Sequence, residues 1–235
     1  MLSNLKICGM TEPETARFCV AAGVGALGAV FYANSPRCVT PEQARALFEG
    51  LPAHIARVGV FVNCTPDDML ATARIAGLTT LQLHGQETRA DIEAGLAYGY
   101  RVIKVLTATG DRLLKTASSL PSEAGILVEC GTGSLPGGNG AVWNWADAAP
   151  LAALRPFALA GGLDADNIVN ALRLSGAVAY DVSSGVEIRP GVKSHALIRT
   201  LTHALRAHAG ETRAPSFWLP AREPRSEVRN HPPNT

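Results

Sequence analysis

Short apolar runs alternate with amphipathic stretches along almost the whole chain. Runs typical of buried strands cover residues 5–9, 26–31, 55–62, 79–84, 101–105, 125–129, 156–160 and 177–181. Apolar positions at helical spacing cover residues 13–22, 41–48, 66–75, 87–97, 164–172 and 194–208. Strands that alternate with helices are typical of βαβ units and a parallel sheet. Eight strands predict an α/β fold with a single closed (β/α)8 TIM barrel, and an open doubly wound sheet is the alternative.

Several predicted helices begin with recognisable signals. Thr40 and Thr65 each precede a proline, the arrangement of an N-cap followed by the first helical residue. Thr11, with Glu14 three residues later, predicts a capping box. The first strand is followed by Cys-Gly-Met-Thr at residues 8–11 and not by Gly-x-Gly-x-x-Gly. This difference favours the barrel over a dinucleotide-binding sheet.

Composition narrows the classes of function. The chain has 235 residues and a formal net charge of +1, so its charge does not favour nucleic acid or a membrane surface as a partner. The N-terminus has no signal-peptide pattern, and no apolar stretch approaches the ~18 residues that a membrane helix needs. Five cysteines without a Cys-x-x-Cys pair favour reduced thiols over disulfides or a zinc site. We therefore expect a cytoplasmic protein.

The end of the chain differs from the rest. Residues 210–235 combine prolines and mixed charges with no apolar periodicity. We therefore divide the chain into a barrel domain, residues 1–209, and a Pro/Arg-rich tail, residues 210–235, which we expect to be disordered. The Phe-Trp-Leu triplet at residues 217–219 could dock on the barrel or on a partner. A mobile extension with no role in chemistry is the favoured interpretation.

The alternation of side chains along each strand predicts which groups reach the inside of the barrel. Active sites of this fold lie at the carboxyl ends of the strands. Lys6 and Cys8 share one face of the first strand, and an ammonium below the thiol favours the thiolate. Other polar side chains expected on the inner face are Gln82, His84, Lys104, Glu129 and Asp181. Several titratable groups around one rim predict a catalytic site.

Two segments rich in glycine and serine follow the last two strands. They are Ala-Gly-Gly-Leu at residues 160–163 and Asp-Val-Ser-Ser-Gly-Val-Glu at residues 181–187. Small residues let backbone N–H groups approach an anion, and barrels commonly hold a phosphate on the loops after strands seven and eight. These segments predict a phosphorylated substrate.

Seven segments, in order, resemble the motif series of the phosphoribosylanthranilate isomerase family. They are residues 6–11, 31–37, 58–63, 81–87, 136–140, 160–163 and 181–187. The resemblance covers nearly all of residues 5–208 and leaves out the tail. It implies a (β/α)8 barrel that catalyses the third committed step of tryptophan biosynthesis. This step is the Amadori rearrangement of N-(5-phosphoribosyl)anthranilate to 1-(2-carboxyphenylamino)-1-deoxyribulose 5-phosphate, with no metal or organic cofactor.

The resemblance also implies roles for individual residues. Cys8 matches the general base, and Glu129 occupies the position of the general acid. Arg37 matches the arginine that engages the anthranilate group, which suits a planar guanidinium. Asp181 matches a substrate-side carboxylate, and His84 ranks lower, as a wall or hydrogen-bonding residue. The residues that match the phosphate site are Gly138, Gly140, Gly161, Gly162, Ser183 and Ser184.

One position departs from the family pattern. The sixth strand usually ends in aspartate in the family, whereas this chain has Glu129. The extra methylene moves the carboxyl by roughly a bond length, and a misplacement of ~1 Å can cost about a hundredfold in rate. A free glutamate has a pKa of ~4.3, which would have to rise for it to hold a proton near neutrality. Either Glu129 serves as the acid, or activity is weak or lost.

Two alternative functions stay open at this point. One is a catalytically weak or inactive paralogue that binds a phosphate ligand. The other is a bifunctional isomerase of the histidine and tryptophan pathways, which would need a second phosphate site after strands three and four. Residues 63–66 and 84–87 there contain neither Gly-Gly nor Ser-Ser-Gly, which counts against it. The expected partner is a small-molecule phosphoribosyl substrate, and the chain is expected to be a monomer or a homodimer.

Overall fold

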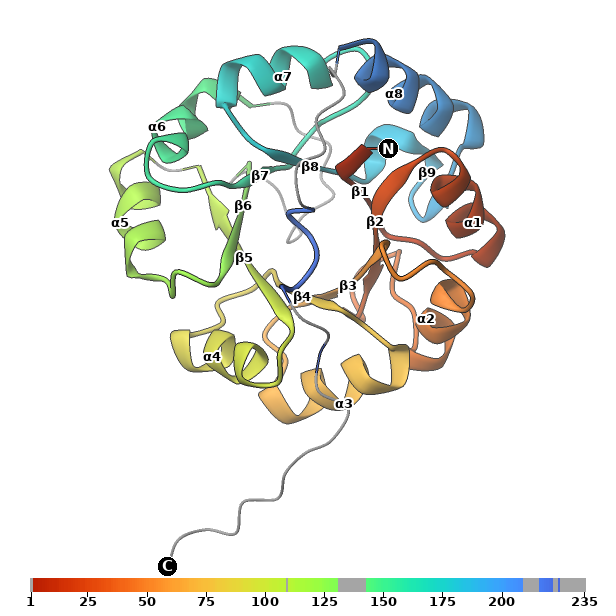
Figure 1. Cartoon of the computed structure of the whole chain (residues 1–235), viewed down its shortest axis with the longest axis horizontal. Coiled ribbons are helices and arrows are strands. Elements are labelled where there is room, and N and C mark those ends of the chain that lie inside the picture. The colour runs from red at the N-terminus through yellow and green to blue at the C-terminus, as the bar shows by residue number, and fades with distance from the viewer. Residues whose placement is uncertain (1, 109, 131–142, 209–215, 222–223, 225–235) are drawn as a thin grey trace, which may run out of the picture.

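The structure is a computed structural model that describes residues 2–108, 110–130, 143–208, 216–221 and 224. Eight parallel strands form a closed barrel in which each strand pairs with the next and β8 pairs with β1 (Figure 1). The strands are β1 (Leu2–Cys8), β2 (Val24–Val30), β3 (Ala56–Phe61), β4 (Thr80–Leu83), β5 (Arg101–Thr107), β6 (Gly125–Glu129), β7 (Ala158–Leu159) and β8 (Ala179–Val182). The predicted (β/α)8 barrel is confirmed.

The helices form a ring outside the strands (Figure 1). They are α1 (Pro13–Ala21), α2 (Pro41–Phe48), α3 (Pro66–Ala76), α4 (Arg89–Ala97), α5 (Asp111–Ser119), α6 (Ala149–Ala152), α7 (Ile168–Ser175) and α8 (His195–His208). Two short 3-10 helices, Trp145–Ala148 and Ser184–Val186, precede α6 and follow β8. An antiparallel hairpin that the sequence pattern did not predict, β9 (Glu187–Arg189) and β10 (Val192–Lys193), follows the second of them.

Two of the three predicted helix caps are confirmed. The Thr40 and Thr65 hydroxyls accept hydrogen bonds from backbone N–H groups in the first turns of α2 and α3. The capping box at Thr11 is wrong, because α1 begins after Glu12 without a side-chain cap. The Thr11 hydroxyl instead donates to the carbonyl of Gly191, at 2.8 Å. This bond ties the loop after β1 to the β9–β10 hairpin.

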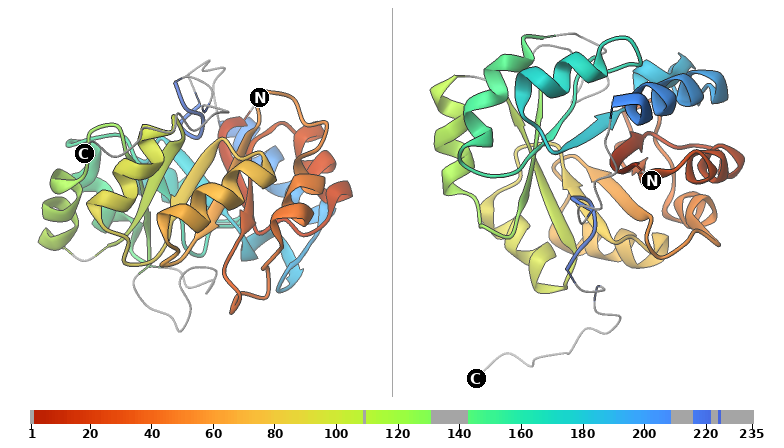
Figure 2. Two further views of the ribbon diagram at one scale, coloured as in Figure 1. Left: turned by 90° about the horizontal axis from the view of Figure 1, so that it is seen from below. Right: turned by 45° about the horizontal axis from the view of Figure 1, so that its top comes forward.

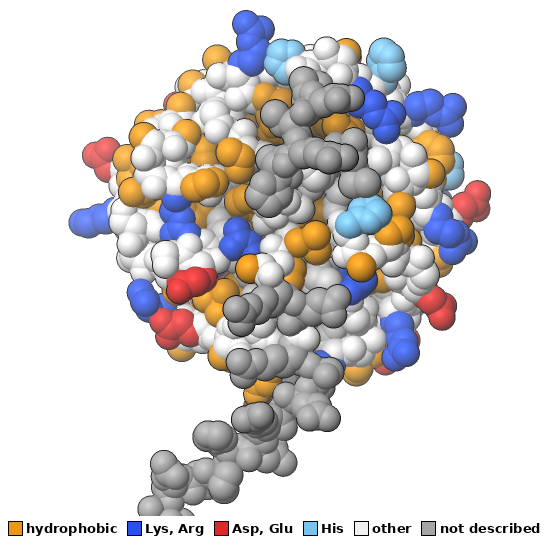
Figure 3. All heavy atoms as spheres, in the orientation of Figure 1, with side chains coloured by type: hydrophobic (Ala, Val, Ile, Leu, Met, Phe, Trp, Pro, Cys, Tyr) orange, Lys and Arg blue, Asp and Glu red, His pale blue; other side chains and the backbone are white. Residues whose placement is uncertain are grey.

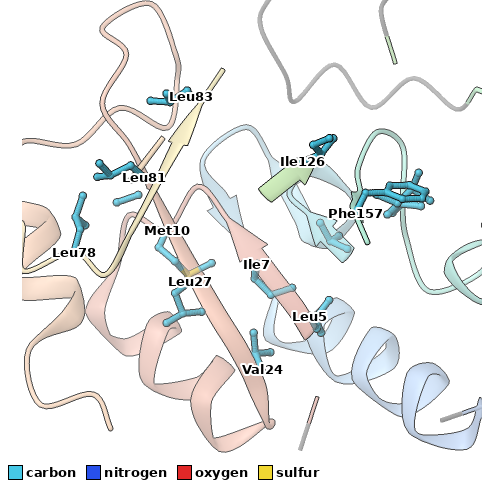
Figure 4. Close-up of a cluster of buried hydrophobic side chains, with 14 of the residues drawn as sticks. Leu5, Ile7, Met10, Val24, Leu27, Leu78, Leu81, Leu83, Ile126 and Phe157 are labelled. Atoms are coloured by element: carbon cyan, nitrogen blue, oxygen red, sulfur yellow. The ribbon is translucent and has the colours of Figure 1, made fainter. Parts of the chain in front are cut away.

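Among the described residues, apolar side chains form two large layers and one small cluster of Cys8, Val30 and Val60. Leu5 and Ile7 point out of the barrel and pack in the larger layer, between strands and helices (Figure 4). The inner layer contains Ile103 and Val105 of β5. Lys104 lies between these two residues, so its side chain leaves the opposite face of the strand. The expectation that Lys104 points inward is therefore wrong.

The described part of the tail lies at the N-terminal end of the barrel, where the blue segment crosses the centre of the ring (Figures 1 and 2). The Ser216 hydroxyl donates to the Ser3 carbonyl, and the Phe217 N–H donates to the Asn4 side chain. Trp218 is fully buried in the inner apolar layer. The docking of residues 217–219 on the barrel, which the sequence left open, is confirmed, and the expectation of disorder is wrong for residues 216–221. For residues 210–215, 222–223 and 225–235 it falls outside the described part of the chain.

The same end of the barrel is seen as a surface in Figure 3. Lys and Arg side chains and Asp and Glu side chains are distributed around its edge. Among the described helices, none combines the length and the apolar character needed to cross a membrane.

Candidate active site

The first strand places an ammonium and a thiol inside the barrel, as predicted. Lys6 is completely buried, and Cys8 is 8% exposed. The Lys6 Nζ donates to Asp181 Oδ2 at 2.7 Å and to Gln82 Oε1 at 2.9 Å. Gly28 of β2 leaves room for both β1 side chains, since a Cβ there would lie 2.9 Å from Cys8 Sγ and 3.0 Å from Lys6 Cε. The predicted convergence of Lys6, Gln82 and Asp181 is confirmed.

Burial and charge act in opposite directions on these two groups. Burial lowers the pKa of Lys6, but Asp181 and Cys8 together outweigh it, so the pKa is raised and the ammonium persists. For Cys8, burial is the largest influence and raises the pKa of the thiol, while Lys6 and Lys193 pull it down less strongly. The ammonium alone does not bias Cys8 toward thiolate in the unliganded protein, which corrects the sequence-based expectation.

A chain of hydrogen bonds connects Lys6 to Glu129. Because a lysine ammonium can only donate, the atom of Gln82 that faces Lys6 is Oε1, and its Nε2 faces His84 Nδ1 at 3.2 Å. His84 Nδ1 therefore accepts, and His84 Nε2 carries a hydrogen and donates to Glu129 Oε1 at 2.7 Å. Four strands (β8, β1, β4 and β6) thus hold one polar network, in which His84 orients the carboxyl of Glu129.

The Arg37 side chain is held by a residue that sequence reasoning did not single out. Its Nε and Nη2 donate to the two carboxylate oxygens of Glu187, at 2.9 and 2.6 Å. Lys193 of β10 donates to the same carboxylate and to the backbone and hydroxyl oxygens of Ser183. Burial alone would raise the pKa of Glu187. The positive charges and hydrogen bonds of Arg37 and Lys193 outweigh the effect of burial and lower this pKa, so the carboxylate stays ionised.

Glu187 and Lys193, which hold Arg37 and Ser183 in place, differ in how far the sequence indicated them. Glu187 lies in the segment of residues 181–187 that resembles the family, so its position was visible although its role was not. Lys193 belongs to the unpredicted hairpin and had no local signal. Both residues reach the site only because the hairpin packs beside the end of β8.

The loops after β7 and β8 have the properties of an anion site. Gly161 and Gly162 both adopt positive φ, 90° and 66°, which glycine adopts without strain. Within the described residues, the backbone N–H groups of Gly161, Gly162 and Ser184 donate no hydrogen bond. The Ser183 hydroxyl donates to the Cys8 carbonyl at 3.1 Å, which joins this loop to β1. The other two predicted phosphate-site residues, Gly138 and Gly140, lie outside the described residues.

In the loops after β3 and β4, a carboxylate of the protein, that of Glu87, takes the place that a bound anion could occupy. The carboxylate of Glu87 accepts from the N–H groups of Asn63 and Gly85, at 2.8 to 3.0 Å. Lys104, which the sequence assigned to the interior, donates to the same carboxylate at 2.8 Å. The Glu87 side chain is 2% exposed. Its carboxylate therefore occupies the N–H groups and the ammonium that a bound anion would use.

One buried acceptor in the site has no protein partner. Asp181 Oδ2 is bonded to Lys6, but Asp181 Oδ1 accepts no hydrogen bond from any described residue. A buried unpaired carboxylate oxygen is costly unless a ligand or solvent satisfies it. In the described part of the chain, no three His, Cys, Asp or Glu side chains gather closely enough to hold a metal ion.

Comparisons with known proteins agree with this geometry. The family model for N-(5'-phosphoribosyl)anthranilate (PRA) isomerase matches residues 5–204. An N-(5'-phosphoribosyl)anthranilate isomerase of Pseudomonas fluorescens is 38% identical over 201 residues, which cover 86% of this chain and 97% of the relative.

Two solved structures resemble the barrel closely. The phosphoribosyl anthranilate isomerase of Thermus thermophilus has a TM-score of 0.80 and 36% identity, covering 88% of this chain and all of that one. A phosphoribosyl anthranilate isomerase in complex with reduced 1-(o-carboxyphenylamino)-1-deoxyribulose 5-phosphate has a TM-score of 0.77 and 34% identity, covering 87% and 98%. The chain therefore belongs to the phosphoribosylanthranilate isomerase family, whose reaction is a step of tryptophan biosynthesis.

Proposed function

We propose that this enzyme converts N-(5-phosphoribosyl)anthranilate to 1-(2-carboxyphenylamino)-1-deoxyribulose 5-phosphate by an Amadori rearrangement, with Cys8 as general base and Glu129 as general acid. The observation that carries the proposal is the hydrogen-bonded network from Asp181 through Lys6, Gln82 and His84 to Glu129. It places an oriented carboxyl group and the Lys6–Cys8 pair at the same end of one barrel.

The reaction needs proton transfers by an acid and a base and no net oxidation. Glu129 donates a proton to the furanose ring oxygen, the ring C–O bond breaks, and an open-chain iminium forms. The Cys8 thiolate then removes the C2′ proton, and the C2′–H electrons form the C1′–C2′ double bond of an enolamine. In the tautomerisation to the ketone, C1′ gains a proton and the C2′ hydroxyl loses one. The proton held by Cys8 is released and Glu129 regains one, so both groups return to their starting states.

The surroundings of Glu129 orient its carboxyl group. His84 donates to Oε1, which leaves Oε2 as the atom that would pass a proton to the substrate. A glutamate side chain has one more rotatable bond than aspartate, and the hydrogen bond to His84 restrains that extra freedom. This contact supports a well-positioned carboxyl group in place of the family aspartate.

The surroundings of Cys8 supply two cations for its thiolate. Lys6 and Lys193 both lower the pKa of the thiol, against the larger effect of burial, which raises it. The raised pKa makes the thiolate, once formed, a stronger base toward the C2′ proton, and it leaves a smaller fraction of thiolate near neutrality.

Substrate contacts can be assigned to groups that the protein leaves available. Glu187 occupies Nε and Nη2 of Arg37, and in the described chain Arg37 Nη1 donates no hydrogen bond, so it is available for the anthranilate carboxylate. Asp181 Oδ1 is buried without a partner among the described residues, so a ribose hydroxyl that reached it would satisfy it. The N–H groups of Gly161, Gly162 and Ser184 are available for the phosphate.

The contacts of Glu87 in the loops after β3 and β4 argue against a bifunctional isomerase. A substrate with two phosphates needs a second anion site there, opposite the first. Glu87 already accepts hydrogen bonds from Asn63 and Gly85 and pairs with Lys104. A second phosphate would have to displace this buried carboxylate or share its partners against charge repulsion.

The proposal is tested by mixing purified protein with freshly generated phosphoribosylanthranilate and following the decay of substrate fluorescence. Decay faster than spontaneous breakdown is expected. Decay at the spontaneous rate with retained ligand binding would instead support the non-catalytic phosphate-binding paralogue.

Variants of Glu129 test the assignment of the acid. Glu129→Asp is expected to retain or raise turnover, and Glu129→Gln to lower it by about 10²- to 10⁴-fold, the usual contribution of acid–base catalysis. Normal turnover by Glu129→Gln would place the acid elsewhere, and Asp181 is the first residue to examine.

A further inference from the structure

The interior of the barrel is incomplete without the C-terminal segment. Inward-facing positions of such barrels are usually filled by bulky branched side chains. Here the inner apolar layer contains small residues from four strands, namely Ala26, Ala56, Ala158 and Ala179. Phe217 and Trp218, from outside the barrel strands, belong to the same layer. The two aromatic rings fill the space that these alanines leave.

The segment is bound by specific hydrogen bonds to residues near the N-terminal ends of three strands, β1, β4 and β5. The Trp218 indole N–H donates to the Asn4 carbonyl at 2.9 Å, and the Thr80 hydroxyl donates to the Trp218 carbonyl. Arg101 donates to the Phe217 carbonyl at 3.2 Å and lies over the Phe217 ring, 5.2 Å from its centre. These contacts make residues 216–219, which we call the plug, a built part of the fold. The family match ends at residue 204, so the plug lies outside it.

Trp218 also touches the polar network of the site from the opposite side. The Lys6 Nζ lies 5.6 Å from the centre of the indole ring, within the range of a cation–π contact. Asp181 and Gln82 hold the same ammonium through hydrogen bonds. The indole therefore closes the N-terminal side of Lys6, which no other aromatic ring contacts within the described residues.

We propose that Trp218 is a positioning residue for the isomerase reaction: its ring holds the Lys6 ammonium against Asp181 and Gln82 and keeps water from its N-terminal side. This inference rests on the proposed function, because it acts through Lys6 on Cys8 and, through Gln82 and His84, on Glu129. In a dry interior the Lys6 charge acts at full strength on its neighbours, whereas water beside the ammonium would screen it.

The test compares two residues of the plug in the full-length protein. Trp218→Leu fills most of the space but removes the ring face, and Trp218→Phe restores a ring without the indole N–H. We expect kcat to fall roughly tenfold in Trp218→Leu, with KM changed less than about twofold, and to be largely restored in Trp218→Phe.

The matched control is Phe217→Leu, because Phe217 belongs to the same plug and packs on Arg101 and edge-on against the Trp218 ring, but makes no cation–π contact with Lys6 among the described residues. It is expected to lower thermal stability and leave kcat unchanged. Wild-type kcat in folded Trp218→Leu, or an equal fall in Phe217→Leu, would overturn the inference. Trp218→Met replaces Trp218→Leu in the comparison if the leucine variant does not fold.

Cys8→Ser, measured alongside, separates this inference from the proposed function. An inactive Cys8→Ser with a fully active Trp218→Leu would refute the role of Trp218 alone. An active Cys8→Ser would refute the assignment of the base, whatever the plug variants do.

Discussion

The two ends of the barrel interior are built from different kinds of residue. At the N-terminal end, Phe217 and Trp218 pack on alanines, and the N–H groups of both residues are paired with Asn4 or Ser216. At the C-terminal end, charged groups predominate, and Asp181 Oδ1 has no hydrogen-bond partner among the described residues. The dry, paired end provides rigidity, whereas the charged end keeps groups available for a ligand. Lys6 contacts both ends.

This difference predicts that activity and stability respond to different ends of the barrel. A change at the charged end should mainly affect turnover. A change at the aromatic end should mainly affect the free energy of unfolding, and should reach turnover only through the contact of Trp218 with Lys6. Four experiments test the separation, beginning with the largest expected effect.

Replacing Cys8 tests the contribution of the charged end to turnover without changing the aromatic end. Cys8→Ser is expected to lower kcat by about 10²- to 10⁴-fold, because a serine hydroxyl does not ionise near neutrality. Product binding and the unfolding midpoint should change little, since the two side chains are similar in size. Substrate fluorescence, product titration and urea unfolding provide the three measurements. Near-wild-type turnover would remove Cys8 from the mechanism.

Truncating Trp218 tests how much the aromatic end contributes to stability. Trp218→Ala empties a fully buried site and is expected to cost about 3–5 kcal/mol of unfolding free energy. Urea unfolding measures this cost. Arg89→Ala is the control, because it breaks an exposed ion pair with Glu93 and is expected to cost about 0–1 kcal/mol. A change in Trp218→Ala no larger than that of the control would mean that the plug does not complete the core.

Alanine variants of two glycines on β2 allow the two ends of the barrel to be compared within one strand. An added Cβ at Gly28 would press on Cys8 and Lys6, whereas one at Gly25 would meet the backbone of Ser3 near the other end. Gly28→Ala is expected to lose roughly 1–3 kcal/mol through overpacking. Gly25→Ala is expected to lose at least as much, because its Cβ would lie within 2.6 Å of Ser3 backbone atoms. Only Gly28→Ala is expected to lower kcat per folded molecule. An equal loss of kcat in both variants would contradict the separation of the two ends.

The smallest expected effect is a dependence of stability on alkaline pH. Burial raises the pKa of Cys8 above its value in the unfolded chain, so the folded state keeps a proton that the unfolded state has lost. This contribution is complete below the ordinary thiol pKa of ~8.5 and is lost as the pH rises through the folded value. Turnover should rise over the same interval, because more Cys8 is thiolate.

Urea unfolding between pH 7 and 10 tests this linkage, with Cys8→Ser as the control. Cys19, whose pKa burial raises to about 12, acts in the same direction in both proteins. The wild type is expected to lose more stability than Cys8→Ser across this range. An equal loss in the two proteins would show that Cys8 makes no such contribution.

Much of the site follows from local patterns. The period of two along β1 and the carboxyl ends of the other strands place Cys8, Lys6, Glu129 and Asp181 inside the barrel. Lys104 was misplaced because one residue of register decides the face, and its strand has apolar residues on both sides. The bonds of Arg37 to Glu187 and of His84 to Glu129 join residues 150 and 45 positions apart, which no local pattern reveals.

By itself, the sequence determined the eight-strand barrel, the glycine- and serine-rich loops and the identity of the groups at its mouth, because periodicity and small-residue spacing are local properties. Only the tertiary structure decided that Trp218 completes the core and lies beneath Lys6. The plug is short and has no periodicity, and it is ordered only because four strands leave alanine-lined space that two aromatic rings can fill. Long-range packing of this kind has no counterpart in the order of neighbouring residues.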